Sequence, residues 1–132
     1  MTTNKVTAYK PASNGKNYSG DKEMVSAYSV IVSNGDGMKE LVTARVWMAR
    51  SNSASVAYAS VWVLAGEKYT AGHGTAKGYG YHRPSAAIGE AIESAGIKLE
   101  KSIYGVGDSA ITDALTAIAN YLGYQKVLVV NH

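Results

Sequence analysis

Residues 41–64 read LVTARVWMARSNSASVAYASVWVL, in which two runs of alternating side chains flank an SNS turn. An alternation with a period of two is typical of β-strands that bury one face. We therefore predict antiparallel strands over residues 41–50 and 54–64. The following side chains share the face that we expect in the core: Val42, Ala44, Val46, Met48, Ala57, Ala59, Val61 and Val63.

The other face of these two strands is unusually aromatic for a surface in contact with water. It carries Arg45, Trp47, Tyr58 and Trp62. Such a concentration of large apolar side chains indicates a surface that something covers. We favour a second copy of the chain, because apolar burial is common at subunit interfaces and Arg45 is the only evident cation on this face. Stacking of nucleic-acid bases on the rings is the alternative.

Strand signals continue on both sides of this pair. A β-rich run at residues 24–33 precedes NGDG at 34–37, whose residues tolerate the positive φ of a hairpin turn. After the second strand, AGEK at 65–68 turns the chain into a further strand over residues 69–76. The pattern predicts an antiparallel β-meander.

Two helices and one more strand follow the meander. Pro84 suits a first helical turn, and apolar residues then recur at helical spacing until Gly96. A second helix begins at Asp108 or Ser109, which can cap it, and ends at Gly123. Residues 126–130 predict a short, fully buried strand. The expected fold class is therefore α+β: a meander of about four to five strands, two C-terminal amphipathic helices on one face, and a final short strand.

Size and composition are consistent with one folded domain. The chain has 132 residues, 46% of them apolar, and a formal net charge of +3. Residues 1–22 are rich in turn formers, so we expect a flexible arm with a short strand near residues 6–9, followed by a single domain over 23–132. The absence of cysteine excludes disulfides and thiol chemistry. The arm contains no apolar run, and we expect a cytoplasmic protein that does not enter a membrane.

The stretch GHGTAKGYGYHRPS at residues 72–85 is the strongest candidate for a ligand site. It contains four of the fourteen glycines, several basic side chains and no carboxylate. Glycines allow a backbone to approach a ligand closely, and the start of a helix favours an anion. We expect a phosphate-bearing ligand here, with a glycine hairpin carrying solvated charges as the alternative. The expected ligand-binding residues are Lys77, Gly78, Tyr79, Gly80, Tyr81, His82, Arg83, Ser85, Asp108 and Ser109.

These residues have different expected roles. Lys77 and Arg83 would neutralise charge, and Tyr79 or Tyr81 would stack on a base. Asp108 suits a ribose hydroxyl or a helix cap. A Gly-x-Gly precedes each predicted helix, at residues 78–80 and 105–107. The two helix starts therefore either converge on one anion or simply need glycine for a sharp turn.

Several chemistries receive little support from the motifs. The spacing in residues 72–85 matches neither a P-loop nor a dinucleotide fingerprint. His73 and His82 lack the further ligands at recognisable spacing that a metal site requires, so we expect neither a metal nor a cofactor. An enzyme that uses His82 with Glu90 or Asp108 as an acid–base pair remains an alternative.

The size and element order resemble those of small phage or prophage accessory proteins, some of which sequester nucleotide signals from host defence. This resemblance implies a non-enzymatic protein that binds a nucleotide or nucleotide-derived signal, and we expect it to work as a homo-oligomer. The residues leave three alternatives open: a single-stranded RNA or DNA binder, the small enzyme described above, and a protein that inhibits a host factor by direct interaction.

Overall fold

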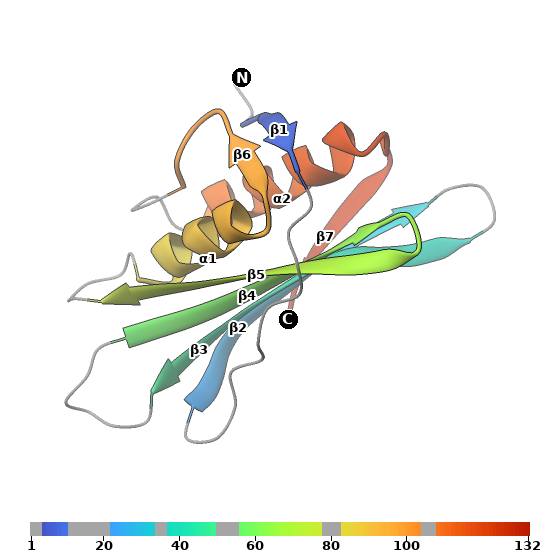
Figure 1. Cartoon of the computed structure of the whole chain (residues 1–132). Helices are drawn as coiled ribbons and strands as arrows, with labels where there is room; N and C mark the ends of the chain where they lie inside the picture. Colours follow the sequence, from blue (N-terminus) through green and yellow to red (C-terminus); the bar gives the residue numbers. More distant parts are fainter. Residues whose placement is uncertain (1–3, 11–21, 34–36, 50–55, 78–82, 104–107) are drawn as a thin grey trace.

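A five-stranded antiparallel sheet forms the base of the molecule. The computed structural model describes residues 4–10, 22–33, 37–49, 56–77, 83–103 and 108–132. The strand order in the large sheet is β5-β4-β3-β2-β7, so that β5 and β7 form its two edges (Figure 1). The bounds are β2 (Lys22–Ser33), β3 (Met38–Ala49), β4 (Val56–Ala65), β5 (Lys68–Lys77) and β7 (Val127–Asn131).

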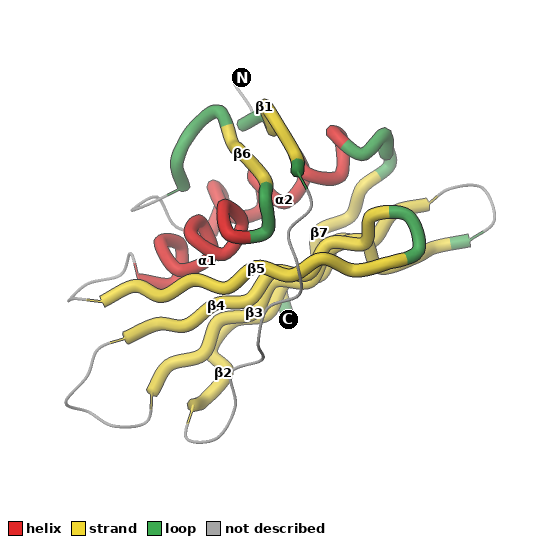
Figure 2. Tube along the Cα trace, viewed as in Figure 1, coloured by secondary structure: helices red, strands yellow, loops and turns green. Residues whose placement is uncertain are grey.

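Two helices, α1 (Arg83–Ser94) and α2 (Asp108–Tyr121), lie on one face of this sheet (Figures 1 and 2). Each helix is followed by a glycine with positive φ, Gly96 at 90° and Gly123 at 100°. After α2, the Tyr124 amide donates to the Ala119 carbonyl and the Gly123 amide to the Asn120 carbonyl, which is the Schellman arrangement. Within the described part of the chain, neither helix has the length and apolar character needed to cross a bilayer.

A second, two-stranded sheet lies above the helices. It pairs β1 (Val6–Tyr9) with β6 (Ile97–Leu99) in antiparallel fashion. The strand expected near residues 6–9 is thus present, and it belongs to the packed structure rather than to a loose arm. We did not predict β6, whose three residues fall below the length at which alternation becomes recognisable. Residues 11–21 of the predicted arm lie outside the described part of the chain.

The predicted faces of β3 and β4 are confirmed. Val42 lies opposite Val63, Ala44 opposite Val61 and Val46 opposite Ala59. All six side chains are buried, and the apolar residues of both helices complete the same core. The α+β class and the antiparallel arrangement are therefore as expected, while the small sheet and β6 are additions.

The final strand differs from the prediction. We expected it to be fully buried, but β7 lies at an edge of the sheet and pairs only with β2 among the described strands. Leu128 is 59% exposed, and no residue of β7 is fully buried. A continuous apolar run in a short strand is equally compatible with a central or an edge position, which the sequence does not distinguish.

Gly72 and Gly74 have a different role from the one we predicted. We assigned the glycines of residues 72–85 to the approach of a ligand, but these two lie within β5 and face α1. A Cβ at position 74 would collide with the Ala87 carbonyl and lie 2.6 Å from the Ala91 nitrogen. A Cβ at position 72 would meet the backbone of Ala91 and Ala95. The two glycines therefore allow the backbone of α1 to lie directly on β5.

Replacing Gly74 with alanine tests this close contact. The Gly74→Ala variant should lose about 3 kcal/mol of unfolding free energy, because the new methyl group meets backbone atoms that cannot rotate away. Urea denaturation followed by circular dichroism measures the loss. Thr75→Ala, in the adjacent residue on the opposite side of β5, is the matched control and should change stability by less than about 1 kcal/mol. An unfolding free energy unchanged by Gly74→Ala would contradict the contact.

Candidate functional site

A cavity lies between α1 and the segment that contains β6. Its volume is about 670 Å³, and it is open to solvent on one side. The residues that line it are Thr75, Ala76, Ala86, Gly89, Glu90, Ile92, Glu93, Ile97, Lys98, Leu99, Lys101, Ser102 and Ile103. It therefore has an apolar floor and a polar rim, the combination that is typical of small-molecule sites.

The rim carries charges of both signs on different elements. Glu90 and Glu93 are exposed on α1, three residues apart and thus on neighbouring positions of the helix surface. Lys98 and Lys101 are exposed on the segment across the cavity, which also contributes Ser102. A ligand in the cavity could therefore donate hydrogen bonds to carboxylates on one wall while it presents negative charge to ammonium groups on the other.

The buried side chain of Asn4 fixes the wall that carries the lysines. Its side-chain amide donates to the Lys101 carbonyl at 2.8 Å and accepts from the Lys101 amide at 2.9 Å, so that one residue holds both backbone groups. The Asn4 backbone amide donates to Asp113 of α2 at 2.7 Å. These bonds join the start of the chain, the cavity wall and the second helix.

The basic part of the predicted stretch, residues 77–85, is attached to the cavity at both of its ends. Ala76 and Ala86, which flank residues 77–85, both line the cavity. Ser85 lies in the first turn of α1, with 1% of its surface exposed. Gly78, Tyr79, Gly80, Tyr81 and His82 lie outside the described residues, as do the side chains of Lys77 and Arg83.

Asp108 and Ser109 form the first turn of α2, as predicted. The buried Tyr28 hydroxyl donates to the Asp108 carboxylate at 2.6 Å. Burial raises the pKa of Tyr28 well above its usual value, and the hydrogen bond and negative charge of Asp108 add to this effect. Ser109 is exposed, and its carbonyl accepts a hydrogen bond from the Thr112 hydroxyl. Asp108 thus anchors α2 to β2, whereas Glu90, the other proposed partner of His82, lines the cavity.

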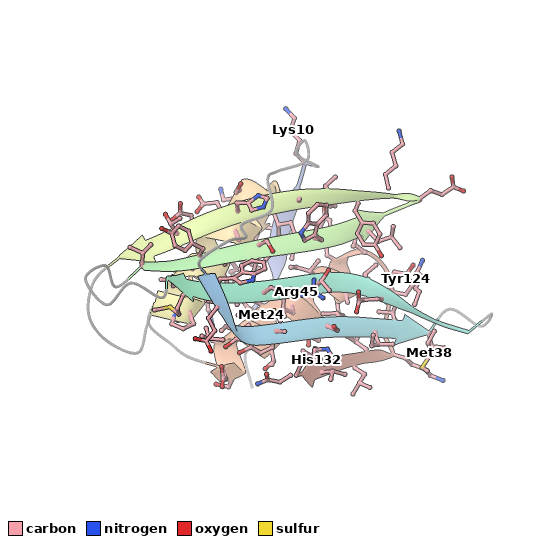
Figure 3. The ribbon with its side chains drawn as sticks, turned by 90° about the horizontal axis from the view of Figure 1, so that it is seen from below. Lys10, Met24, Met38, Arg45, Tyr124 and His132 are labelled. Carbon is pink, nitrogen blue, oxygen red and sulfur yellow. The ribbon has the colours of Figure 1, made fainter. Side chains whose placement is uncertain are left out.

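The aromatic residues lie together on the face of the large sheet opposite the helices (Figure 3). Trp47 is paired with Tyr58, Arg45 with Ser60, and Trp62 with Thr43 across β3 and β4. The four larger side chains are half-buried, while Ser60 and Thr43 are buried beneath them. The face is therefore a band of rings and one guanidinium over a floor of small hydroxyl side chains.

His73 lies on this same face, opposite Ser60 in the β4–β5 pair. Burial lowers the pKa of its imidazole, because the protonated ring would lose solvation. Its backbone amide donates to the Ser94 hydroxyl at 3.3 Å and so ties the edge strand to the end of α1. We had considered His73 only as a metal ligand or proton shuttle.

Sequence reasoning missed the cavity residues Glu93, Lys98 and Lys101. One signal was available for Lys98: in residues 97–100, IKLE, apolar and polar side chains alternate directly after the helix-ending Gly96. That alternation places Lys98 on the side of β6 opposite to Ile97 and Leu99. Among the residues that the structure describes, no three potential metal-ligating side chains come together.

Comparison with protein-family models, curated proteins and solved structures finds no match to this chain.

The lowered pKa of His73 predicts a dependence of stability on pH. Because the folded state takes up a proton less readily than the unfolded state, the free energy of unfolding should fall as the pH drops below the usual histidine value of 6.5. His73→Gln removes this titration and should flatten the decrease of Tm between about pH 7 and pH 5. Differential scanning calorimetry across this range measures both profiles. Parallel profiles for the variant and the unmodified chain would contradict the prediction.

Proposed function

We propose that this chain is a non-enzymatic binding protein that holds a small phosphate-bearing ligand, a nucleotide or nucleotide-derived signal, in the cavity between α1 and β6. The observation that carries the proposal is the attachment of the basic, glycine-rich stretch to this cavity through Ala76 and Ala86. Ile103, two residues before the second Gly-x-Gly stretch, also lines it. Described residues close to both predicted anion-binding stretches, 78–80 and 105–107, thus line the cavity.

The shape and chemistry of the cavity support a nucleotide-sized ligand. Its volume of about 670 Å³ lies within the range of small-molecule pockets. The apolar floor suits a base, and the carboxylates of Glu90 and Glu93 can accept hydrogen bonds from sugar hydroxyls or ring amines. Lys98 and Lys101 supply positive charge for phosphate. The Asp108 carboxylate accepts a hydrogen bond from Tyr28, which favours a structural role for this residue over the acid–base role considered with His82.

Isothermal titration calorimetry with ATP, AMP, a cyclic dinucleotide and inorganic phosphate tests the proposal. The intact chain should bind at least one of the nucleotides, and the double variant Lys98→Ala/Lys101→Ala should bind it at least about tenfold more weakly, equivalent to about 1.4 kcal/mol. Lys68→Ala/Lys126→Ala removes the same charge from outside the cavity and is the matched control. Equal weakening by both double variants, or no binding of any of these ligands, would count against the site.

The aromatic face supports a second candidate function, the binding of single-stranded nucleic acid. The specific observation is the grouping of Trp47, Tyr58 and Trp62 around Arg45 on a sheet face that neither helix covers. Rings of this kind offer stacking surfaces to bases of any sequence, and a guanidinium can pair with phosphate. This function uses a different face from the cavity and does not depend on it.

A fluorescence titration with an oligo(dT) strand tests this second function. Binding should quench the tryptophan emission, and Trp62→Ala should weaken it by roughly tenfold, since one stacked base contributes about 1–3 kcal/mol. Tyr121→Ala removes an exposed ring on α2 and should leave the affinity unchanged. If the emission does not respond to oligo(dT) at low salt, the aromatic face is not a nucleic-acid surface.

A further inference from the structure

We propose that β7 is a dimerisation strand, through which two copies of this chain join edge to edge into one continuous antiparallel sheet. This inference is independent of the ligand cavity and of the aromatic face. It rests on three observations. The first is which backbone groups of β7 point away from β2, here called the hydrogen-bonding phase of the strand. The others are the unprotected outer edge of β7 and the exposed apolar side chains near this strand.

The hydrogen-bonding phase follows from the pairing with β2. The His132 amide donates to the Ala27 carbonyl at 2.8 Å, and the register continues as Asn131 opposite Tyr28 and Val130 opposite Ser29. In an antiparallel ladder, hydrogen-bonded pairs alternate with pairs that are not hydrogen-bonded. Leu128 and Val130 therefore use their backbone groups toward β2. The N–H and C=O groups of Val127, Val129 and Asn131 point to the outer edge, where no described strand pairs with them.

Among the described residues, nothing at the outer edge of β7 supplies the devices that usually prevent strand addition. Proteins protect edges with charged residues, proline, bulges or a covering segment. The strand reads VLVVN, which contains no charge and no proline, and its register with β2 is unbroken. The other edge of the sheet differs, because the amide of His73 in β5 is engaged by Ser94 and the Tyr9 hydroxyl meets Thr70 at 2.7 Å. The β5 edge is thus contacted by Ser94 and Tyr9, whereas no described strand pairs with the outer edge of β7.

Exposed apolar side chains lie on β7 and two strands away at the start of β3, and of these Leu128 on β7 is the one that a second copy at the outer edge would contact. Met38 and Leu128 are 77% and 59% exposed, the highest values among the large apolar side chains of the described residues. Both line a shallow groove of about 400 Å³ that also includes Ile31, Lys126 and Val127. Figure 3 shows Met38 at the end of the sheet where the groove lies and His132 at the β7 edge.

A second copy of β7 fits this edge by symmetry. An antiparallel pair of identical strands is related by a two-fold axis, so each strand offers its partner the same donors and acceptors. With the axis at Val129, the middle residue of the five, Val127 of each copy lies opposite Asn131 of the other, and every edge-facing group is paired. Leu128 then lies opposite Val130 of the other copy. Leu128 and Val130 of the two copies therefore form apolar cross-strand pairs on either side of the axis.

The interface is small, so we expect a dimer that depends on concentration. Sedimentation velocity from about 1 µM to 1 mM should show a monomer that converts to a dimer. Val129→Pro should weaken the dimer at least tenfold, because proline removes the edge-facing amide while the bonds to β2 are retained. Val129→Ala, which keeps that amide, should still dimerise. Leu128→Lys is a second test at an exposed position that does not endanger folding, and it should also weaken the dimer at least tenfold.

Amide hydrogen exchange provides a direct test of the hydrogen-bonding phase. The amides of Leu128 and Val130 should be protected at every concentration, whereas those of Val127, Val129 and Asn131 should become protected only where the dimer forms. A chain that stays monomeric up to 1 mM would overturn the proposal, including the case in which a strand of a different protein occupies this edge. A dimer that both Val129→Pro and Leu128→Lys leave intact would overturn it as well.

Discussion

The direct contact between the backbone of α1 and strand β5 is the constraint on which the rest of the structure depends. It exists because Gly72 and Gly74 present no side chain to the helix, and because Ala87, Ala91 and Ala95 present only methyl groups to the strand. Because α1 lies this close to the edge strand β5, the outer side of the helix is free to form a wall of the cavity. That wall, with Glu90 and Glu93 on its rim, is one side of the cavity. A change at the glycines would therefore move the site as well as the core.

Those parts of the fold that depend on local pattern were predictable. The alternation in β3 and β4 identified which side chains enter the core, since the two faces of a strand are fixed by its geometry. The glycines after the helices marked both ends, because the left-handed conformation is costly for other residues. The reason for Gly72 and Gly74 was not predictable. A glycine has the same local signature whether a ligand or a helix approaches it, and the helix that approaches here comes from later in the chain.

In the candidate site, too, features with a local sequence pattern were predictable and features that depend on distant residues were not. The basic stretch of residues 72–85 stood out by composition, and Thr75 and Ala76 within it and Ala86 directly after it line the cavity. The opposite wall could not be found from sequence, because nothing near Lys98 and Lys101 in the sequence distinguishes them from other surface lysines. The backbone at Lys101 is fixed by Asn4, which lies 97 residues away in the chain. Asp108 likewise suited either a ligand or a cap, and only the position of Tyr28 distinguishes a structural role. Long-range hydrogen bonds fix the positions of these residues, and such bonds leave no local trace in the sequence.

The three surfaces that carry function in these proposals occupy separate parts of the molecule. The cavity lies beside α1 and β5, the aromatic band lies on the opposite face of β3 and β4, and the free strand edge is β7. Because β5 and β7 are the two ends of the strand order, pairing through β7 would place the cavities at the far ends of a joined sheet and leave both open. It would also align the aromatic bands of two copies on one side of that sheet. Dimerisation could therefore double the length of a nucleic-acid surface without any change in the affinity of the cavity, so the two binding functions respond differently to the same assembly.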